Sequence, residues 1–264
     1  MLIDPKSSLV KGVARLSKKD ARSQTGLFLL EGPQGLKEAV RTPKVIVELY
    51  ATPDCVERYP DLFEQVRQAR IDVTLVSERV LDAMCDTSTP QGVLAVCQQV
   101  HVSLDSVLKV KPRLVAMLSQ VRDPGNAGTV LRAADAAGAD AVIFTDNSVD
   151  IYNPKVVRST TGSLFHLPIV QGVSVQDAIA ALRAAGLQVF AADGGGDLIN
   201  DLPAGTLAAP TAWVFGNEAW GFEAETLAAV DRVVGLPLYG PAESLNLATA
   251  ASVCLYQSAF AQRA

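Results

Sequence analysis

The stretch VRDPGNAGTVLRAADAAGAD (121–140) predicts a short helix with one apolar face and one polar face. Asp123 can cap its start, Pro124 suits the first helical position, and Gly138 suits its end. The apolar face repeats at helical spacing and consists of Ala127, Val130, Leu131, Ala134 and Ala137. The polar face repeats every third residue and consists of Asn126, Thr129, Arg132 and Asp135. Such a face can bind an anionic group near the helix start, although a merely solvated face would look the same.

Strand-like and helix-like segments alternate on both sides of this stretch. In the second half of the chain, the expected strands are 114–118, 141–145, 167–170, 187–191, 212–215 and 232–236. A long helix is expected from about Ser244 to the end. Mostly apolar, β-branched strands between helices are typical of a parallel sheet covered on both faces. The fold class predicted for this half is therefore α/β.

The first hundred residues alternate in the same way. The expected elements are a basic helix near 8–20, strands at 27–30, 44–52, 71–77 and 92–98, and helices at 32–40, 61–69 and 78–85. This order indicates a small α/β/α unit. Residues 100–113 show no strong pattern and contain the expected linker. We therefore predict two domains, 1–105 and 106–264.

The composition bounds the class of protein. The chain has 264 residues, of which 49% are hydrophobic and 19% are charged, as in globular domains. The first residues lack the apolar core of a secretion signal, and no apolar run is long enough for a membrane helix. A cytoplasmic protein without membrane contact is expected. Four scattered cysteines without a C-x-x-C pair, and only His101 and His166 beside them, argue against a metal site or a disulfide framework.

Positive charge gathers at the start of the chain. Residues 1–22 hold six basic and two acidic side chains, whereas the whole chain has a net charge of −5. A basic arm on an acidic body suits local contact with phosphate groups, although a solvated amphipathic helix has the same composition. The basic residues considered for such contact are Lys11, Arg15, Lys18, Lys19 and Arg22.

A second informative stretch, WVFGNEAWGF (213–222), runs from an expected strand into a loop flanked by glycines. Open α/β sheets bind ligands at the carboxyl ends of their strands, where glycines allow close backbone approach. Asn217 and Glu218 are the expected polar tips of this loop, although a plain turn would also place them there. Trp213 and Trp220 could both stack on bases, but Trp213 lies in the strand and is expected in the core.

A third stretch, GLPLYGPAESLNLATAASVCLYQ (235–257), leads from a strand through a loop into the last helix. Ser244 is a natural N-cap for that helix. Asn246 would lie in the first turn, where the positive helix end favours polar or anionic ligands. Small side chains would let another backbone pack tightly against the helix: Ala248, Ala250, Ala251 and Ser252. The glycines after Asp193 lack the spacing of a dinucleotide-binding loop.

These three stretches together resemble the SpoU-type (TrmH-like) RNA ribose 2′-O-methyltransferases of the SPOUT class. The matching elements are N-x5-R at Asn126 and Arg132, the F-G-N-E-x-x-G loop, the L-P-L…E-S-L-N segment, and IYNPKVVRSTTGSLFHLPIV (151–170) with Arg158. The first half resembles the substrate-binding domain often fused to these enzymes, through L-V-K (9–11), G-L-F-L-L-E-G (26–32) and T-P-Q-G (89–92). The order and separation of the motifs make the resemblance specific, and it covers nearly the whole chain.

The resemblance implies a knotted SPOUT domain with a parallel sheet, preceded by a small α/β/α domain similar to a ribosomal protein. The knot would hold S-adenosylmethionine in a bent form, although knots are rare among folds in general. The implied cofactor contacts are Gly216, Leu236, Leu238, Leu245 and Asn246. The last helix would help to form a homodimer, and the RNA site would combine groups from both protomers. The implied RNA contacts are Lys11, Arg15, Lys18, Lys19, Arg22 and Arg158.

The implied catalytic residues are Arg132, Asn126, Glu218, Ser244 and Asn246. The reaction requires a ribose hydroxyl in line with the methyl group and an acceptor for its proton. Deprotonating a guanidinium at pH 7 costs on the order of 7 kcal/mol. We therefore expect Arg132 to bind phosphate and to stabilise the negative charge that grows on the 2′-oxygen. Asn126 would orient Arg132 or the ribose, and both Arg132 and Glu218 remain candidates for the proton acceptor.

Two alternatives share much of this pattern. A tRNA methyltransferase would have the same chemistry, but the ribosomal-protein-like first half favours 23S rRNA as the substrate. A non-catalytic RNA-binding factor for ribosome assembly would need none of the implied catalytic side chains, all of which are present.

Overall fold

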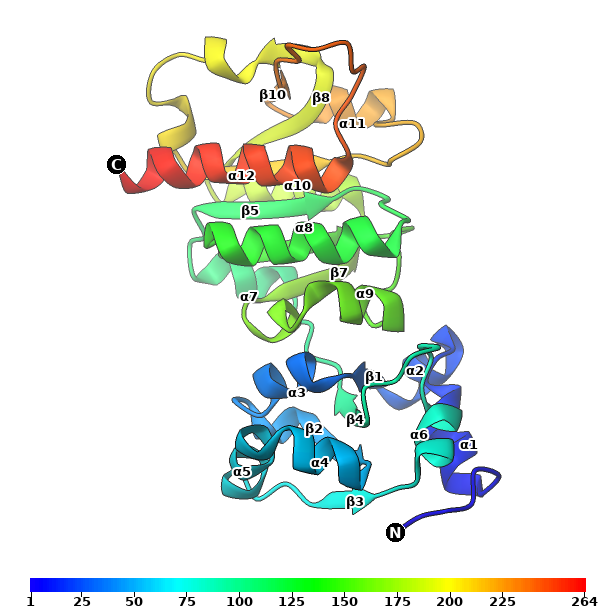
Figure 1. Cartoon of the computed structure of the whole chain (residues 1–264). Helices are drawn as coiled ribbons and strands as arrows, with labels where there is room; N and C mark the ends of the chain where they lie inside the picture. Colours follow the sequence, from blue (N-terminus) through cyan, green and yellow to red (C-terminus); the bar gives the residue numbers. More distant parts are fainter. The chain divides into compact units, whose positions relative to one another are not determined.

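Two sheets organise the chain, and each belongs to one compact unit (Figure 1). The computed structural model describes residues 1–264. Unit 1 comprises Met1–Val100 and Tyr152–Phe165, and unit 2 comprises His101–Ile151 and His166–Ala264. None of the helices has both the length and the apolar character needed to cross a lipid bilayer.

Unit 1 is built on a four-stranded sheet in the order β1-β4-β2-β3. Its strands are β1 (Leu27–Glu31), β2 (Ile46–Ala51), β3 (Val73–Leu75) and β4 (Val93–Gln98). Its helices are α1 (Ser8–Arg15), α2 (Lys19–Thr25), α3 (Pro33–Ala39), α4 (Pro53–Arg58), α5 (Pro60–Gln68), α6 (Glu78–Met84) and α9 (Pro154–Thr160), with 3-10 turns η1 (Pro43–Val45) and η2 (Ser163–Phe165). Strand β4 runs antiparallel to β1 and β2, whereas β3 runs parallel to β2. All four strands expected here are present, although β2 begins only after the turn η1.

Unit 2 is built on a six-stranded sheet in the order β10-β8-β9-β5-β6-β7, in which every neighbouring pair is parallel. Its strands are β5 (Leu114–Leu118), β6 (Ala141–Thr145), β7 (Ile169–Val173), β8 (Gln188–Leu198), β9 (Thr211–Phe215) and β10 (Arg232–Gly235). Its helices are α7 (Leu104–Lys109), α8 (Pro124–Ala137), α10 (Val175–Ala184), α11 (Ala224–Ala229) and α12 (Leu247–Arg263), with 3-10 turns η3 (Ile199–Asp201) and η4 (Thr206–Ala208).

Helices cover both faces of the six-stranded sheet. On one face, Ile143 and Val214 belong to a core cluster shared with Val107 of α7 and Ile179 of α10. Trp213 points to the opposite face, because side chains alternate along a strand. There its Nε1 donates a hydrogen bond of 2.9 Å to Ser258 Oγ on α12, which packs against α8. The predicted α/β fold with a covered parallel sheet is confirmed.

Helix α8 begins and ends as the sequence predicts. The backbone N–H of Asn126 donates to Asp123 Oδ1 at 2.7 Å, and Pro124 is the first helical residue. Gly138 follows the last turn with a φ of 68°, in the left-handed region that glycine adopts readily. All five apolar residues of the predicted buried face are buried. Local capping and a helical repeat therefore suffice to define this helix.

Other elements differ from the expectations. The expected linker contains the helix α7. Helix α12 begins at Leu247, and its N-cap is Asn246 rather than Ser244, because the backbone N–H groups of Ala248 and Thr249 donate to Asn246 Oδ1 at 2.9 and 3.3 Å. The small side chains Ala248 and Ala251, expected to face another chain, are buried in this unit.

Strand β8 is longer than expected because it continues through its glycines to Leu198. A Cβ atom at Gly196 would lie 2.4 Å from the carbonyl carbon of Val233. Val234 and Gly235 pair with Asp197 and Leu198 just beyond this contact. The glycines therefore allow β10 to approach β8.

Residues 152–165 follow β6 in the sequence but belong to unit 1. The ring centroid of Phe28 on β1 lies 4.8 Å from that of Tyr152 and 6.4 Å from that of Phe165. Tyr152 Oη accepts a hydrogen bond of 2.7 Å from the backbone N–H of Val100. The compact units therefore do not coincide with the predicted domains 1–105 and 106–264. The first part of unit 1 ends at Val100, and residues 152–165 form its second part.

Candidate active site

A cavity of about 450 Å³ lies in unit 2, where β9 and β10 end and where β8 leaves its pairing with β9. Three segments supply most of its wall, at 192–194, 217–221 and 234–247, and α8 contributes Asn126. In open parallel sheets ligands bind at the carboxyl ends of the strands, and cavities of roughly 300–1,000 Å³ hold small molecules. Besides Arg132, four polar residues are predicted for this site. They come from three separate segments and all line the cavity: Asn126, Glu218, Ser244 and Asn246.

A chain of hydrogen bonds joins three of these polar side chains. Asn246 Oδ1 caps α12, so its Nδ2 is the group that turns outward, and this amide nitrogen donates to Asn126 Oδ1 at 2.9 Å. Asn126 Nδ2 in turn donates to Glu218 Oε1 at 3.3 Å. The helix cap thus sets the orientation of both amides.

Glu218 also accepts two backbone hydrogen bonds from the start of α8. The N–H groups of Arg122 and Asp123 donate to its carboxylate at 3.2 and 3.1 Å. A negative charge near a helix N-terminus is stabilised by the helix dipole. Glu218 therefore ties the loop after β9 to α8, and its Oε2 atom keeps one free acceptor position.

Asn217 is not a polar tip of this loop, because its side chain is turned into the protein and is 6% exposed. Its Nδ2 donates to the carbonyl of Gln120 at 2.8 Å, and its Oδ1 accepts from the backbone N–H of Ala219 at 2.8 Å. Its backbone exchanges hydrogen bonds with Gly221. A Cβ atom at Gly216 would lie 2.6 Å from the Gly221 carbonyl oxygen. Gly216 therefore permits loop closure, and within this loop Gly221, not Gly216, lines the cavity.

The apolar part of the wall comes from the leucines predicted to contact a cofactor. Leu236, Leu238 and Leu245 all line the cavity. Leu238 is 41% exposed and Leu245 is 39% exposed, although both are large apolar residues. An apolar ligand surface placed here would cover them, which favours binding.

Arg132 lies on α8 outside the cavity wall. It follows Asn126 by six residues, which corresponds to about 9 Å along the helix axis. Its side chain is exposed and makes no hydrogen bond or ion pair within the chain. The guanidinium is therefore available to an anion from outside the chain.

Two carboxylates of the cavity wall, Asp193 and Glu243, are absent from the residues predicted from sequence. Asp193 comes just after the expected strand 187–191, so its strand-end position was the available signal. Glu243 precedes Ser244 in a motif that was already selected. Together with Glu218, these carboxylates give the wall a negative character that suits a positively charged ligand group.

The thiols are unsuited to nucleophilic catalysis. All four cysteines are free. Burial raises the pKa of Cys85 and of Cys254 to about 12, and it also raises the pKa of Cys55 and Cys97. A reactive cysteine needs a lowered pKa instead. The structure also contains no cluster of three His, Cys, Asp or Glu side chains able to hold a metal ion.

The basic residues predicted for RNA contact divide into two groups. Lys11, Arg15, Lys18 and Lys19 are exposed in unit 1. Arg22 is 2% exposed, and its Nη1 donates to the carbonyls of Leu16 and Ser17 at 2.9 and 2.8 Å. Its guanidinium therefore holds the turn between α1 and α2 instead of facing solvent.

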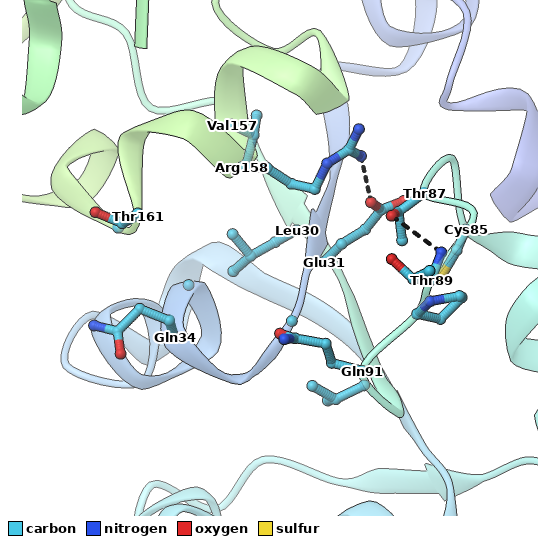
Figure 2. A pocket seen from close by; sticks show the side chains of 15 residues that line it. Leu30, Glu31, Gln34, Cys85, Thr87, Thr89, Gln91, Val157, Arg158 and Thr161 are labelled. Atoms are coloured by element: carbon cyan, nitrogen blue, oxygen red, sulfur yellow. Dashed lines mark hydrogen bonds and ion pairs between the residues drawn. The ribbon is translucent and has the colours of Figure 1, made fainter. Parts of the chain in front are cut away.

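Arg158 is also engaged within unit 1. It lines a cavity of about 310 Å³, where it pairs with Glu31 (Figure 2). Its guanidinium also pairs with Asp86 at 3.2 Å. The Glu31 side chain is only 3% exposed, and it also accepts a hydrogen bond from the backbone N–H of Asp86. The positive charge of Arg158 is therefore balanced inside the protein.

Comparisons with known proteins agree with this geometry. Residues 113–256 match the SpoU rRNA Methylase family, and residues 7–95 match the MRM3-like substrate binding domain. The chain is 35% identical over 253 residues to the 23S rRNA (guanosine(2553)-2′-O)-methyltransferase RlmP of Bacillus subtilis, covering 95% of this chain and 96% of that protein.

Two solved structures resemble the whole chain. One is the SpoU methyltransferase AviRb from Streptomyces viridochromogenes in complex with the cofactor AdoMet, with a TM-score of 0.82, 30% identity, and coverage of 97% of this chain and 99% of that chain. The other is an AdoMet-bound rRNA methyltransferase from Sinorhizobium meliloti, with a TM-score of 0.82, 28% identity, and coverage of 97% and 96%. The similarity extends through both units and includes the motifs that line the cavity. The chain therefore belongs to the SpoU rRNA methylase family.

Proposed function

We propose that this protein transfers the methyl group of S-adenosylmethionine to a ribose 2′-hydroxyl of 23S rRNA. The observation that carries the proposal is that the three family motifs, far apart in the sequence, meet around one cavity at the strand ends. The Bacillus subtilis relative, aligned over nearly its whole length, is named as a 23S rRNA 2′-O-methyltransferase. This favours rRNA over the tRNA alternative, and ribosomal RNA as substrate implies action in the cytoplasm.

The residues present fit S-adenosylmethionine. The exposed Leu238 and Leu245 and the partly buried Leu236 can cover its apolar parts. The wall also carries the carboxylates of Asp193, Glu218 and Glu243. These negative groups suit a cofactor that carries an ammonium and a sulfonium charge. When bound, the cofactor supplies an electrophilic methyl group. We also propose that unit 2 has the knotted chain path that the family resemblance implies.

The chain's own residues would position the ribose and manage its charge. Asn126 and Asn246 present fixed amides at the cavity, and Ser244 makes no hydrogen bond within the chain, so its hydroxyl is available to a ligand. Arg132 would bind a phosphate of the RNA and stabilise the negative charge on the 2′-oxygen. Between the two candidate proton acceptors, Glu218 avoids the cost of deprotonating a guanidinium, about 7 kcal/mol at pH 7.

We further propose that the protein acts as a homodimer in which Arg132 of one protomer serves the cavity of its partner. Within one chain Arg132 lies outside the cavity wall, so a second copy could supply the missing group. Helix α12 exposes a stripe of apolar side chains, Val253, Tyr256 and Phe260, with exposures of 38%, 37% and 64%. Exposed apolar side chains at this spacing are typical of an interface.

Unit 1 would bind the RNA substrate, in line with the predicted role of residues 1–105. Its match to a substrate-binding domain and its exposed basic side chains at Lys11, Arg15, Lys18 and Lys19 support this assignment. Residues 106–264 would carry catalysis. Arg22 and Arg158 are left out of the proposed RNA surface because both already bind groups of the protein.

The proposal is tested by two measurements on the intact protein. Calorimetry should give a 1:1 complex with S-adenosylmethionine per chain, and ribose-methylation mapping should find one 23S rRNA position that is modified only in cells containing the protein. Absence of cofactor binding at high micromolar concentration would favour a non-catalytic factor for ribosome assembly. Modification of a tRNA position instead would favour the tRNA alternative.

A further inference from the structure

The loop after β9 exposes a tryptophan that lies outside the buried core. Trp220 is 48% exposed, and its indole N–H donates to no group of the chain. Trp213, seven residues earlier, is fully buried, packs edge-on against Phe190 at 5.5 Å and donates to Ser258. Core packing and hydrogen bonding therefore explain Trp213 but leave Trp220 unexplained.

The Trp220 ring lies against the side chain of Arg122. The guanidinium carbon of Arg122 lies 4.9 Å from the centroid of the indole ring, within the range of a cation–π contact. Arg122 forms no side-chain hydrogen bond or ion pair within the chain, so its guanidinium N–H groups remain free to bind an anion.

The pair is anchored to the candidate active site through Glu218. The Glu218 carboxylate lines the cavity and accepts a hydrogen bond from the backbone N–H of Arg122. Trp220 follows Glu218 by two residues, a separation that spans at most about 7 Å along the chain. The aromatic ring and the free guanidinium therefore lie beside the cavity wall.

An exposed aromatic ring with an adjacent guanidinium matches the chemistry of an unstacked nucleotide. Bases of single-stranded RNA segments stack on aromatic and guanidinium planes, and guanidinium groups bind phosphates. Stacking accepts any base, so this pair would hold a nucleotide without reading its identity.

We infer that Trp220 and Arg122 form a stacking site for an unpaired RNA nucleotide at or next to the one whose ribose is methylated. The inference rests on the proposed RNA substrate and adds the place where a base is held. In this site the indole ring of Trp220 would stack on the base, and the free guanidinium N–H groups of Arg122 would bind the neighbouring phosphate.

Trp220→Ala should raise the KM for unmodified, in vitro transcribed 23S rRNA roughly 5- to 150-fold, which is the range that stacking of one base on an aromatic ring contributes. The affinity for S-adenosylmethionine should stay within twofold of wild type. Trp220→Phe should recover most of the RNA affinity, because it keeps an aromatic face. Arg122→Ala should also raise KM and should weaken the salt dependence of RNA binding. Lys109→Ala, at an exposed basic residue of α7, is the matched control and should change neither quantity.

Fluorescence tests the same site without any need for activity. The transcript should quench the emission of the wild-type protein, because Trp220 is the exposed one of its two tryptophans. Trp220→Phe should retain the emission of buried Trp213, which reports correct folding, and should lose the quenching. Equal KM values for wild type and Trp220→Ala, or equal quenching in Trp220→Phe, would overturn the inference. If wild type transfers no methyl group yet shows Trp220-dependent quenching, the stacking site stands and the proposed reaction fails.

Discussion

Arg158 of unit 1 and two arginines of unit 2, Arg122 and Arg132, differ in whether their charge is balanced within the protein. In unit 1, Arg158 beside the 310 Å³ cavity binds Glu31 and Asp86, so its charge is balanced by the protein itself. In unit 2, Arg122 and Arg132 carry no such partners. A charge that is balanced internally stabilises the structure, whereas a charge without a partner remains available to an external ligand. We therefore expect Arg158 to have a structural role, and we propose a binding role for Arg122 and Arg132.

Arg132→Ala gives the largest expected effect and tests the binding half of this comparison. Loss of a group that stabilises transition-state charge should lower kcat on 23S rRNA by at least about a hundredfold. The melting temperature should be unchanged, because Arg132 makes no contact that holds the fold. Arg132→Lys keeps a positive charge, and its pH–rate profile should have the same shape and position as that of the wild type. A profile displaced with the lysine would identify this position as the titrating base.

Arg158→Ala tests the structural half. The substitution leaves the buried Glu31 carboxylate without its cation, so the free energy of unfolding should fall by about 2–3 kcal/mol. Urea unfolding followed by circular dichroism measures this change. Arg67→Ala removes an exposed pair with Glu64 and serves as the control, with no measurable change expected. Unchanged stability together with lost RNA affinity would move Arg158 into the RNA-binding group.

Gly216→Ala tests why a glycine is needed at this position. The glycine either allows the loop to close against Gly221 or contacts S-adenosylmethionine directly. The added methyl group would meet the Gly221 carbonyl oxygen at 2.6 Å and displace the loop that carries Glu218. We expect a loss of about 1–2 kcal/mol in stability and a clear loss of S-adenosylmethionine affinity. Gly240→Ala is the matched control, because nothing lies within 4 Å of its Cβ position. A Gly216→Ala variant with native stability but no cofactor affinity would point to direct contact instead.

The thiols of Cys85 and Cys254 give the smallest expected effect at neutral pH, because both are protonated there in the folded and the unfolded state. The effect at high pH should be similar in kind in both units. Burial raises the pKa of Cys85 in unit 1 and of Cys254 in unit 2 from 9.0 to about 12. The folded state therefore holds these protons more tightly, so their contribution is complete below pH 9 and is lost as pH rises toward 12. The free energy of unfolding should decline over this window. The double variant Cys85→Ala, Cys254→Ala should show a shallower decline, and an equal slope would contradict this cause.

Local signals were sufficient where a single segment decides the structure. The start, end and buried face of α8 follow from Asp123, Pro124, Gly138 and an apolar repeat, and all agree with the structure. The start of α12 could not be decided locally, because Ser244 and Asn246 are both good caps. Asn246 caps the helix with its oxygen while its nitrogen binds Asn126, more than a hundred residues away in the sequence.

Long-range packing explains the remaining differences. Composition placed Arg22 in a basic arm but could not reveal that its guanidinium turns inward onto two carbonyls. Periodicity detected the strand before Asp193, and the position of Asp193 after that strand was the only signal for its place in the cavity wall. The attachment of residues 152–165 to unit 1 depends on Phe28 and Glu31, which lie far earlier in the chain.

Because residues 152–165 belong to unit 1, the two units cannot be separated by cutting the chain once. A truncation after residue 105 would remove the aromatic neighbours of Phe28 and the cation of Glu31, so the isolated N-terminal fragment should aggregate or unfold. The reciprocal fragment would expose the apolar side of α9. A single cut at residue 105 therefore cannot separate the proposed RNA-binding unit from the proposed catalytic unit.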